Sequence, residues 1–190
     1  MSIDNGETAA LAGGVTFRPL AADDAEALAA AYTVNREHLA PWEPVRPEAF
    51  FTPERQRERI EGLLRQRAEG FVVPWVLAEA DGRIVGAVTL TGISRGPFCS
   101  AYIGYWVAVD RQGLGLAGAA VSRVCGLARD RLGLHRIEAS TLVENTGSQR
   151  VLAKCGFEPI GMAPDYLHIN GRWRDCRLFQ RILHDGDPAW

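Results

Sequence analysis

The stretch "VAVDRQGLGLAGAAV", residues 107–121, follows an apolar run and leads into an alanine-rich one. Its glycines Gly113, Gly115 and Gly118 have the spacing G-x-G-x-x-G. Glycines at the start of a helix let the backbone approach a ligand closely, and the free N–H groups there favour a phosphate. The first question is therefore which phosphate-bearing molecule, if any, this loop binds.

A Rossmann dinucleotide site is one interpretation, because a strand precedes the loop, a helix follows it and Glu138 stands in the next strand. Two features count against it. Asp110, Arg111 and Gln112 separate the strand from the first glycine, and hairpin signals flank the one crossover, whereas a Rossmann fold needs several βα units. A P-loop is excluded because no Gly-Lys-Ser/Thr follows. A plain turn with incidental glycines is a further alternative.

The residues "QGLGLA", 112–117, offer a third interpretation because they fit the pattern Gln/Arg-x-x-Gly-x-Gly/Ala. This loop resembles the acetyl-CoA loop of the GNAT N-acetyltransferase superfamily. The resemblance implies that the pyrophosphate of acetyl-CoA lies over the backbone N–H groups of this loop, at the start of the following helix.

The resemblance covers roughly residues 15–182. "AYIGYWVAV" (101–109) is similar to the family's central strand, whose exposed backbone pairs with the pantetheine amides, and "NTGSQRVLAKCGF" (145–157) is similar to its N-x-x-S segment. "NREHLAPWEP" (35–44) and "DYLHINGRWRD" (165–175) resemble the RimJ/RimL group, with RimJ the nearer of the two. The cofactor-binding residues implied are Trp106, Val107, Ala108, Val109, Gln112, Gly113, Leu114, Gly115, Leu116, Ala117, Asn145 and Ser148.

The chain is expected to form one domain over residues 15–183, with a flexible N-terminal tail at 1–14 and a C-terminal tail at 184–190. Asp81-Gly82 and Asn170-Gly171 each separate two apolar runs, which is typical of a β-hairpin. The expected fold class is α/β with a mixed sheet, in which antiparallel strands surround one parallel β-α-β crossover at the cofactor site. Strands are expected at 15–20, 71–80, 83–93, 101–109, 136–143, 157–169 and 172–183, and helices at 22–32, 52–70, 116–132 and 145–156.

The composition is ordinary for a globular protein, with 190 residues, 47% hydrophobic and 23% charged residues, and a net charge of −2. That charge gives no indication of a nucleic-acid or membrane partner. The 4 cysteines form no C-x-x-C pair and the 4 histidines have no metal-ligand spacing, so no metal is expected. The sequence has no signal-peptide pattern and no long apolar run, and a cytoplasmic protein, monomeric or homodimeric, is expected.

The implied reaction transfers acetyl from a thioester to an amine, and it needs a base, oxyanion donors and an acid for the leaving thiolate. The resemblance implies that Asp165 is the base and Ser148 the acid, with Tyr166 as a rival acid. Each has a structural alternative: Asp165 as a turn residue, Ser148 as an early-helix hydroxyl, and Tyr166 as a packed aromatic. Asn145 is equally a good N-cap.

The acceptor amine is expected to meet Trp42, Glu43, Tyr105 and Asp165. Glu43 would bind the ammonium while Trp42 walls the slot, although Glu43 can equally be an ordinary loop carboxylate. The predicted activity is acetyl-CoA-dependent N-acetylation of a protein or peptide N-terminus, including that of a ribosomal protein. Acetylation of a small-molecule amine and a CoA-binding module without turnover are the alternatives.

Overall fold

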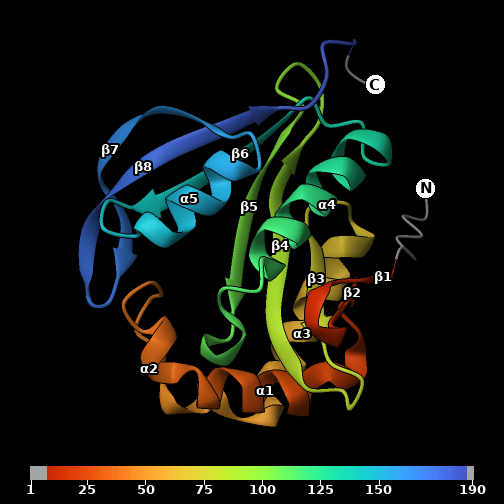
Figure 1. Cartoon of the computed structure of the whole chain (residues 1–190), viewed down its shortest axis with the longest axis vertical. Coiled ribbons are helices and arrows are strands. Elements are labelled where there is room, and N and C mark those ends of the chain that lie inside the picture. The colour runs from red at the N-terminus through yellow and green to blue at the C-terminus, as the bar shows by residue number, and fades with distance from the viewer. Residues whose placement is uncertain (1–7, 188–190) are drawn as a thin grey trace.

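The computed structural model of the chain describes residues 8–187. Within that range the strands form one eight-stranded mixed sheet in the order β1-β2-β3-β4-β5-β6-β8-β7 (Figure 1). The strands are β1 (Ala9–Ala10), β2 (Thr16–Pro19), β3 (Val73–Ala78), β4 (Ile84–Ser94), β5 (Ser100–Val107), β6 (Arg136–Leu142), β7 (Glu158–Ile169) and β8 (Arg172–Ile182). The α-helices are α1 (Ala25–Val34), α2 (Arg36–Leu39), α3 (Pro53–Ala68), α4 (Leu116–Asp130) and α5 (Thr146–Lys154).

Both predicted hairpins form. Gly82 has φ +87° in the β3–β4 turn, and Asn170 and Gly171 have φ +49° and +78° in the β7–β8 turn. Positive φ at both central residues matches the right-handed twist of the flanking strands, and Asn-Gly is the pair that adopts it most readily. The start of α3 is also as predicted, because the Thr52 side chain accepts a hydrogen bond from the Arg55 N–H and Pro53 occupies the first turn.

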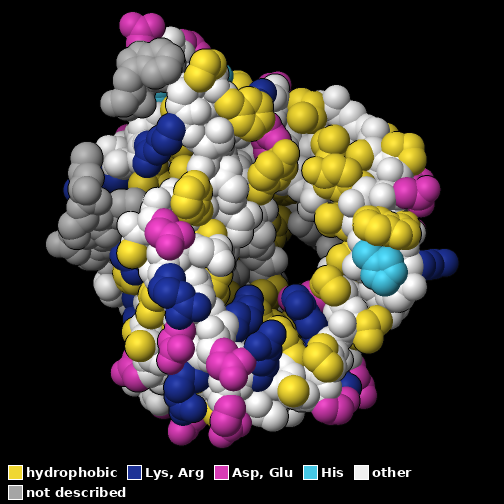
Figure 2. Space-filling view, turned by 180° about the vertical axis from the view of Figure 1, so that it is seen from behind, with side chains coloured by type: hydrophobic (Ala, Val, Ile, Leu, Met, Phe, Trp, Pro, Cys, Tyr) yellow, Lys and Arg dark blue, Asp and Glu magenta, His cyan; other side chains and the backbone are white. Residues whose placement is uncertain are grey.

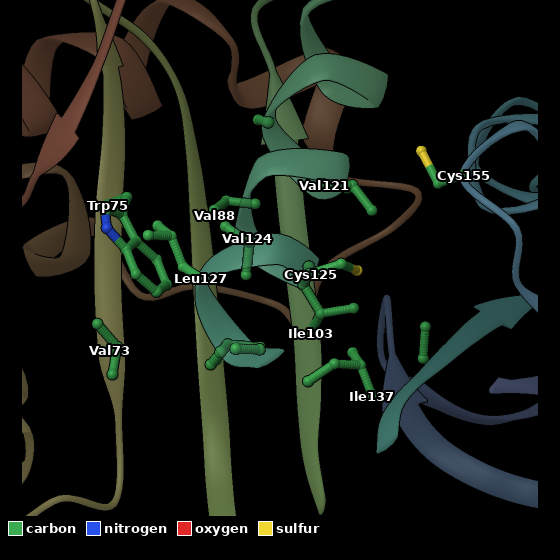
Figure 3. Packing of buried hydrophobic residues seen from close by; sticks show 14 of the residues in the cluster. Val73, Trp75, Val88, Ile103, Val121, Val124, Cys125, Leu127, Ile137 and Cys155 are labelled. Carbon is green, nitrogen blue, oxygen red and sulfur yellow. The ribbon is translucent and has the colours of Figure 1, made fainter. Parts of the chain in front are cut away.

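Helices cover both faces of the sheet, with α4 and α5 in front of it and α3 behind it in Figure 1. Every residue of β3 is buried because alternate side chains enter two different cores. Trp75 packs with α4, whereas Val76 packs with α1 and α3. The α4 side of the main core is shown in Figure 3, where the apolar stripe of that helix meets Trp75, Val88 and Ile103; the stripe consists of Val121, Val124, Cys125 and Leu127.

The parallel crossover is the feature that positions the site. Strands β5 and β6 pair in parallel over Ser100↔Arg136, Ala101↔Ile137 and Tyr102↔Glu138. Beyond that point β5 continues alongside β4, whereas β6 continues alongside β8. The two strands therefore diverge, and a wedge opens between them toward the end of β5.

Two segments differ from the sequence prediction. Residues 9 and 10, predicted as part of a flexible tail, form β1 on the edge of β2, and Ala12–Gly14 forms a short 3₁₀ helix. Such a short strand carries no periodic signal of its own. The predicted C-terminal tail is anchored at its first residue, since His135 Nδ1 lies 2.6 Å from the His184 carbonyl oxygen. Residues 1–7 and 188–190 lie outside the described range.

Candidate active site

The loop before α4 offers backbone N–H groups with no side-chain cap. Gly115 is the N-cap with φ +76°, and Gly113 has φ +78°. A Cβ added at either glycine would meet no atom within 4 Å, so the glycines are needed for their conformation and not for lack of room. Gln112 and Leu114 are also exposed. The first N–H groups of a helix have no partner within it, so this loop can hold an anion.

Ion pairs and a buried amide fix the segment that leads to this loop. Arg83 Nη2 donates to Asp110 Oδ2 at 2.6 Å, and this hydrogen bond holds the pKa of Asp110 below its usual value. Asn35, which is 2% exposed, accepts the Val109 N–H at 2.9 Å. The Ala108 N–H donates to Val85 O at 2.8 Å. Two N–H groups at the end of the predicted cofactor-binding strand are therefore used within the protein. Beyond Tyr102 the strand pairs with β4 only, so the edge that faces away from β4 is the part left for a ligand.

Asn35 and His38 are site residues that the sequence analysis did not single out. Asn35 lies between α1 and α2, and His38 lies in α2, where its Nε2 is 3.2 Å from Gln112 Nε2. The one signal in the sequence was an asparagine at the end of an alanine-rich helix. If such an amide is buried, it needs hydrogen-bond partners elsewhere in the protein.

Ser148 and Tyr105 meet in the wedge between β5 and β6. The Tyr105 hydroxyl and Ser148 Oγ lie 2.8 Å apart. Burial raises the pKa of Tyr105 to about 12, although the hydrogen bond with Ser148 works in the opposite direction. Asn145 caps α5, because its Oδ1 accepts the Ser148 N–H at 3.0 Å. The cap fixes the first turn of α5 and thereby the position of the Ser148 hydroxyl.

Asp165 and Tyr166 stand in a bulge of β7. The β7–β8 register shifts between Ala163 and Leu167, and Asp165 has φ +46°. The Asp165 N–H donates to Asp175 Oδ1 at 2.9 Å, which holds the bulge and leaves the Asp165 side chain exposed. A non-glycine residue in this region of φ is uncommon and concentrates at functional sites.

Tyr166 interacts with Tyr102, whereas the Ser148 hydroxyl interacts with Tyr105. A hydrogen bond to the Glu138 carboxylate, followed by burial, raises the pKa of Tyr102 to about 12, and Tyr166 adds to that shift. The two candidate acids therefore have different partners. The Ser148 hydroxyl hydrogen-bonds Tyr105, and Tyr166 pairs with Tyr102 near the start of the wedge.

An acceptor-sized cavity of about 240 Å³ lies behind the sheet, between the strands and helices α1 and α3. Its lining includes Glu43 from the loop after α2 and Tyr105 from β5. A second cavity of about 170 Å³ also has Glu43 in its wall, together with Asn170 of the β7–β8 turn. Seen from this side, the molecule has a deep hollow with Lys and Arg side chains gathered below it (Figure 2).

The predicted acceptor residues do not all reach this hollow. The Asn170 N–H donates to the Glu43 carbonyl oxygen at 3.0 Å, so the hairpin tip and the loop of Glu43 close on each other. Trp42 was expected to wall the slot, but its side chain is 37% exposed and lines neither cavity. The Trp42 N–H closes the turn after α2 by donating to Leu39 O at 2.9 Å.

Comparison with known proteins agrees with this geometry. The acetyltransferase (GNAT) domain family matches residues 15–158. The chain belongs to the GNAT acetyltransferase family. It is 36% identical over 177 residues to "Probable N-acetyltransferase YjcK" of Bacillus subtilis (strain 168), covering 91% of this chain and 96% of that protein.

Two solved structures place this GNAT protein in the RimJ/RimL-like group. Ribosomal-protein-S5-alanine acetyltransferase from Vibrio fischeri superimposes with a TM-score of 0.91 at 34% identity, over 96% of this chain and 100% of that chain. Mycobacterium smegmatis RimJ in complex with CoA-disulfide superimposes with a TM-score of 0.84 at 36% identity, over 88% of this chain and 81% of that chain. The protein is an acetyl-CoA-dependent N-acetyltransferase with the mixed sheet of its family.

The α4 loop fits the acetyl-CoA that the family uses, because an uncapped helix start with two left-handed glycines suits a pyrophosphate. Within residues 8–187, no three His, Cys, Asp or Glu side chains are grouped so that they could hold a metal ion. Across the same residues, no helix has both the length and the apolar character needed to cross a bilayer.

Proposed function

We propose that this GNAT enzyme acetylates the N-terminal α-amino group of a protein, with a ribosomal protein that begins with alanine as the acceptor. The observation that supports a working transfer site is the position of Tyr105. This residue hydrogen-bonds Ser148 in the wedge and also lines the cavity that contains Glu43. The relative from Vibrio fischeri is named for acetylating alanine of a ribosomal protein. The proposed place of action is the cytoplasm, where such acceptors are made.

Ser148 stabilises the leaving group in this proposal. Acetyl-CoA, when bound, supplies a thioester whose carbonyl carbon takes the amine and whose sulfur departs as a thiolate. The Ser148 hydroxyl donates to that sulfur while its oxygen accepts the Tyr105 O–H. A phenol with a pKa of about 12 keeps its proton beside a thiolate, since an ordinary thiol has a pKa of about 8.5. The two hydroxyls therefore act by hydrogen bonding, and Tyr166 is not needed as an acid.

Asp165 is the proposed base, and Glu43 the proposed ammonium ligand. The bulge that Asp175 holds presents the Asp165 carboxylate on β7 with its backbone in a sparsely populated conformation. A weak base suffices for an α-amino group, whose ordinary pKa is about 7.7–8.0, because roughly a tenth of it is already neutral at pH 7. The lysine side chain, at about 10.4, is a far poorer nucleophile at the same pH.

A panel of short peptides that differ only in their first residue, assayed beside a set of small-molecule amines, tests the proposal, with CoA release and product mass as the readouts. Turnover with N-terminal alanine above the other peptides supports it. Turnover confined to small-molecule amines would replace it with the small-molecule alternative. Cofactor binding without acetylation of any amine would show a CoA-binding module.

A further inference from the structure

The charge of the cavity behind the sheet indicates which acceptors the enzyme prefers, an inference that rests on the proposed function. Three charged side chains line the cavity of about 240 Å³: Glu43, Arg46 and Arg59. The rest of its lining is apolar or neutral. The cavity therefore has one positive charge in excess, although the whole chain has a net charge of −2.

Arg59 differs from other arginines of its surroundings in the partners that it has. Its Nη1 donates to the neutral Gln56 Oε1 at 3.3 Å, and its guanidinium lies 5.6 Å from the centre of the Tyr32 ring. Arg55, one turn earlier on α3, donates to the Glu58 carboxylate at 2.7 Å. The Arg59 guanidinium therefore packs against the Tyr32 ring on one side. Glu58, an acid on this part of α3, pairs with Arg55 and not with Arg59.

Arg46 supports the same side of the cavity. Its guanidinium lies 4.5 Å from the centre of the Phe50 ring, and its Nε lies 3.4 Å from Glu43 Oε2. That distance is beyond the usual range of a charge-assisted hydrogen bond, so the pair can open without losing a strong contact. A guanidinium stacked on aromatic rings presents its N–H edge in a fixed plane, which suits a carboxylate.

We propose that Arg59, assisted by Arg46, binds the carboxylate of an aspartate or glutamate within the first few residues of the acceptor polypeptide. Glu43 would bind the N-terminal ammonium group and Arg59 the acidic side chain. The cavity would therefore bind a positive group followed, along the acceptor chain, by a negative one. A polyamine is disfavoured because two guanidinium groups repel its second positive charge. The enzyme would thus select acceptors by the charge that follows the N-terminal residue.

The test uses the full-length enzyme with alanine-initiated peptides that carry glutamate at position 2, 3 or 4, each paired with its glutamine isostere. At least one glutamate peptide should have a kcat/KM ~10-fold above its isostere at low salt, the effect of one charge-assisted hydrogen bond. The ratio should shrink as ionic strength rises, because salt screens a partly exposed pair. Arg59→Gln should bring the ratio close to one.

Two further variants separate recognition from damage to the fold. Arg57 lies exposed on the same helix and does not line the cavity, so Arg57→Gln should keep the wild-type ratio. Arg59→Glu should reverse the preference toward a lysine in the same position, which a merely unfolded variant cannot do. A wild-type ratio near one at every position would overturn the inference while leaving N-terminal acetylation standing. A ratio that survives Arg59→Gln would also overturn it, and failure to acetylate any peptide would overturn the proposed function as well.

Discussion

Helices α4 and α5 both begin beside the wedge between β5 and β6, but their first turns are built in opposite ways. Helix α4 starts at Gly115 in the left-handed region, with no side-chain cap. Helix α5 starts at Asn145, whose side chain accepts the Ser148 N–H. The uncapped start leaves N–H groups for an anionic ligand, whereas the capped start closes them and offers the Ser148 hydroxyl instead. We propose that the start of α4 serves cofactor binding and that the start of α5 serves the chemistry.

The sharpest way to break this comparison is to close the start of α4. Gly115→Asp would force a residue with a Cβ to adopt φ +76° and would put a negative charge where the pyrophosphate is expected. Acetyl-CoA affinity should therefore fall by more than ~100-fold. Titration calorimetry measures the effect. Gly70→Asp is the matched control, since Gly70 has φ +85° at the end of α3 and equal free space. Unchanged CoA affinity in Gly115→Asp would end the assignment of this loop.

The next largest expected effect on activity comes from removing the proposed base. Asp165→Asn keeps the shape of the side chain and removes its basicity, so kcat/KM should fall by ~10²–10⁴-fold near pH 7. Part of the loss should return as pH rises, because the amine then loses its proton without help. The measurement is a pH series of kcat/KM for both enzymes. Wild-type kcat/KM at pH 7 in the variant would remove Asp165 from the mechanism.

The chemical role of the α5 start is tested through the hydroxyl pair. Ser148→Ala and Tyr105→Phe should each lower kcat by ~10-fold or more and leave acetyl-CoA affinity nearly intact, because the interaction strengthens in the transition state. The double variant should lose less than the product of the two single losses, since the hydroxyls share one hydrogen bond. Loss of cofactor affinity at constant kcat would instead make Ser148 a binding residue.

The smallest expected effect comes from the N-cap side chains of two helices, one beside the site and one away from it. Asn145→Ala and Thr52→Ala should each cost about 1 kcal/mol of unfolding free energy, because each removes an N-cap side chain. Only Asn145→Ala should also lower kcat, since only that cap fixes Ser148. Denaturant unfolding and steady-state kinetics on both variants provide the check, and equal kcat in the two would contradict the coupling.

The start of α4 could be predicted from the sequence because its requirements are local: glycine at positions of positive φ, followed by an alanine-rich helix. The same holds for the Asn170-Gly171 turn. The pairing of Tyr105 with Ser148 could not be predicted, since it depends on the divergence of β5 from β6. Asn35 reaches Val109 only in the folded chain, for the same reason.

The positions of the acceptor residues are the hardest to predict, because loops take their positions from tertiary contacts. Within the motif around Trp42, Glu43 lines the cavity and Trp42 does not. Arg59 stands among alternating arginines and glutamates, a pattern that is typical of a solvated helix face. Its role in the cavity depends on the packing of α3 against Tyr32 and Phe50.

In the proposed function, acetyl passes from acetyl-CoA held at the α4 loop to an α-amino group. One measurement addresses it most directly: acetylation at pH 7 of a peptide that has a free N-terminus and one internal lysine, with fragment masses locating the product. Acetyl is expected on the α-amino group in at least ~10-fold excess, since the ordinary pKa values of the two amines differ by more than two units. Acetyl placed mainly on the lysine side chain would contradict it.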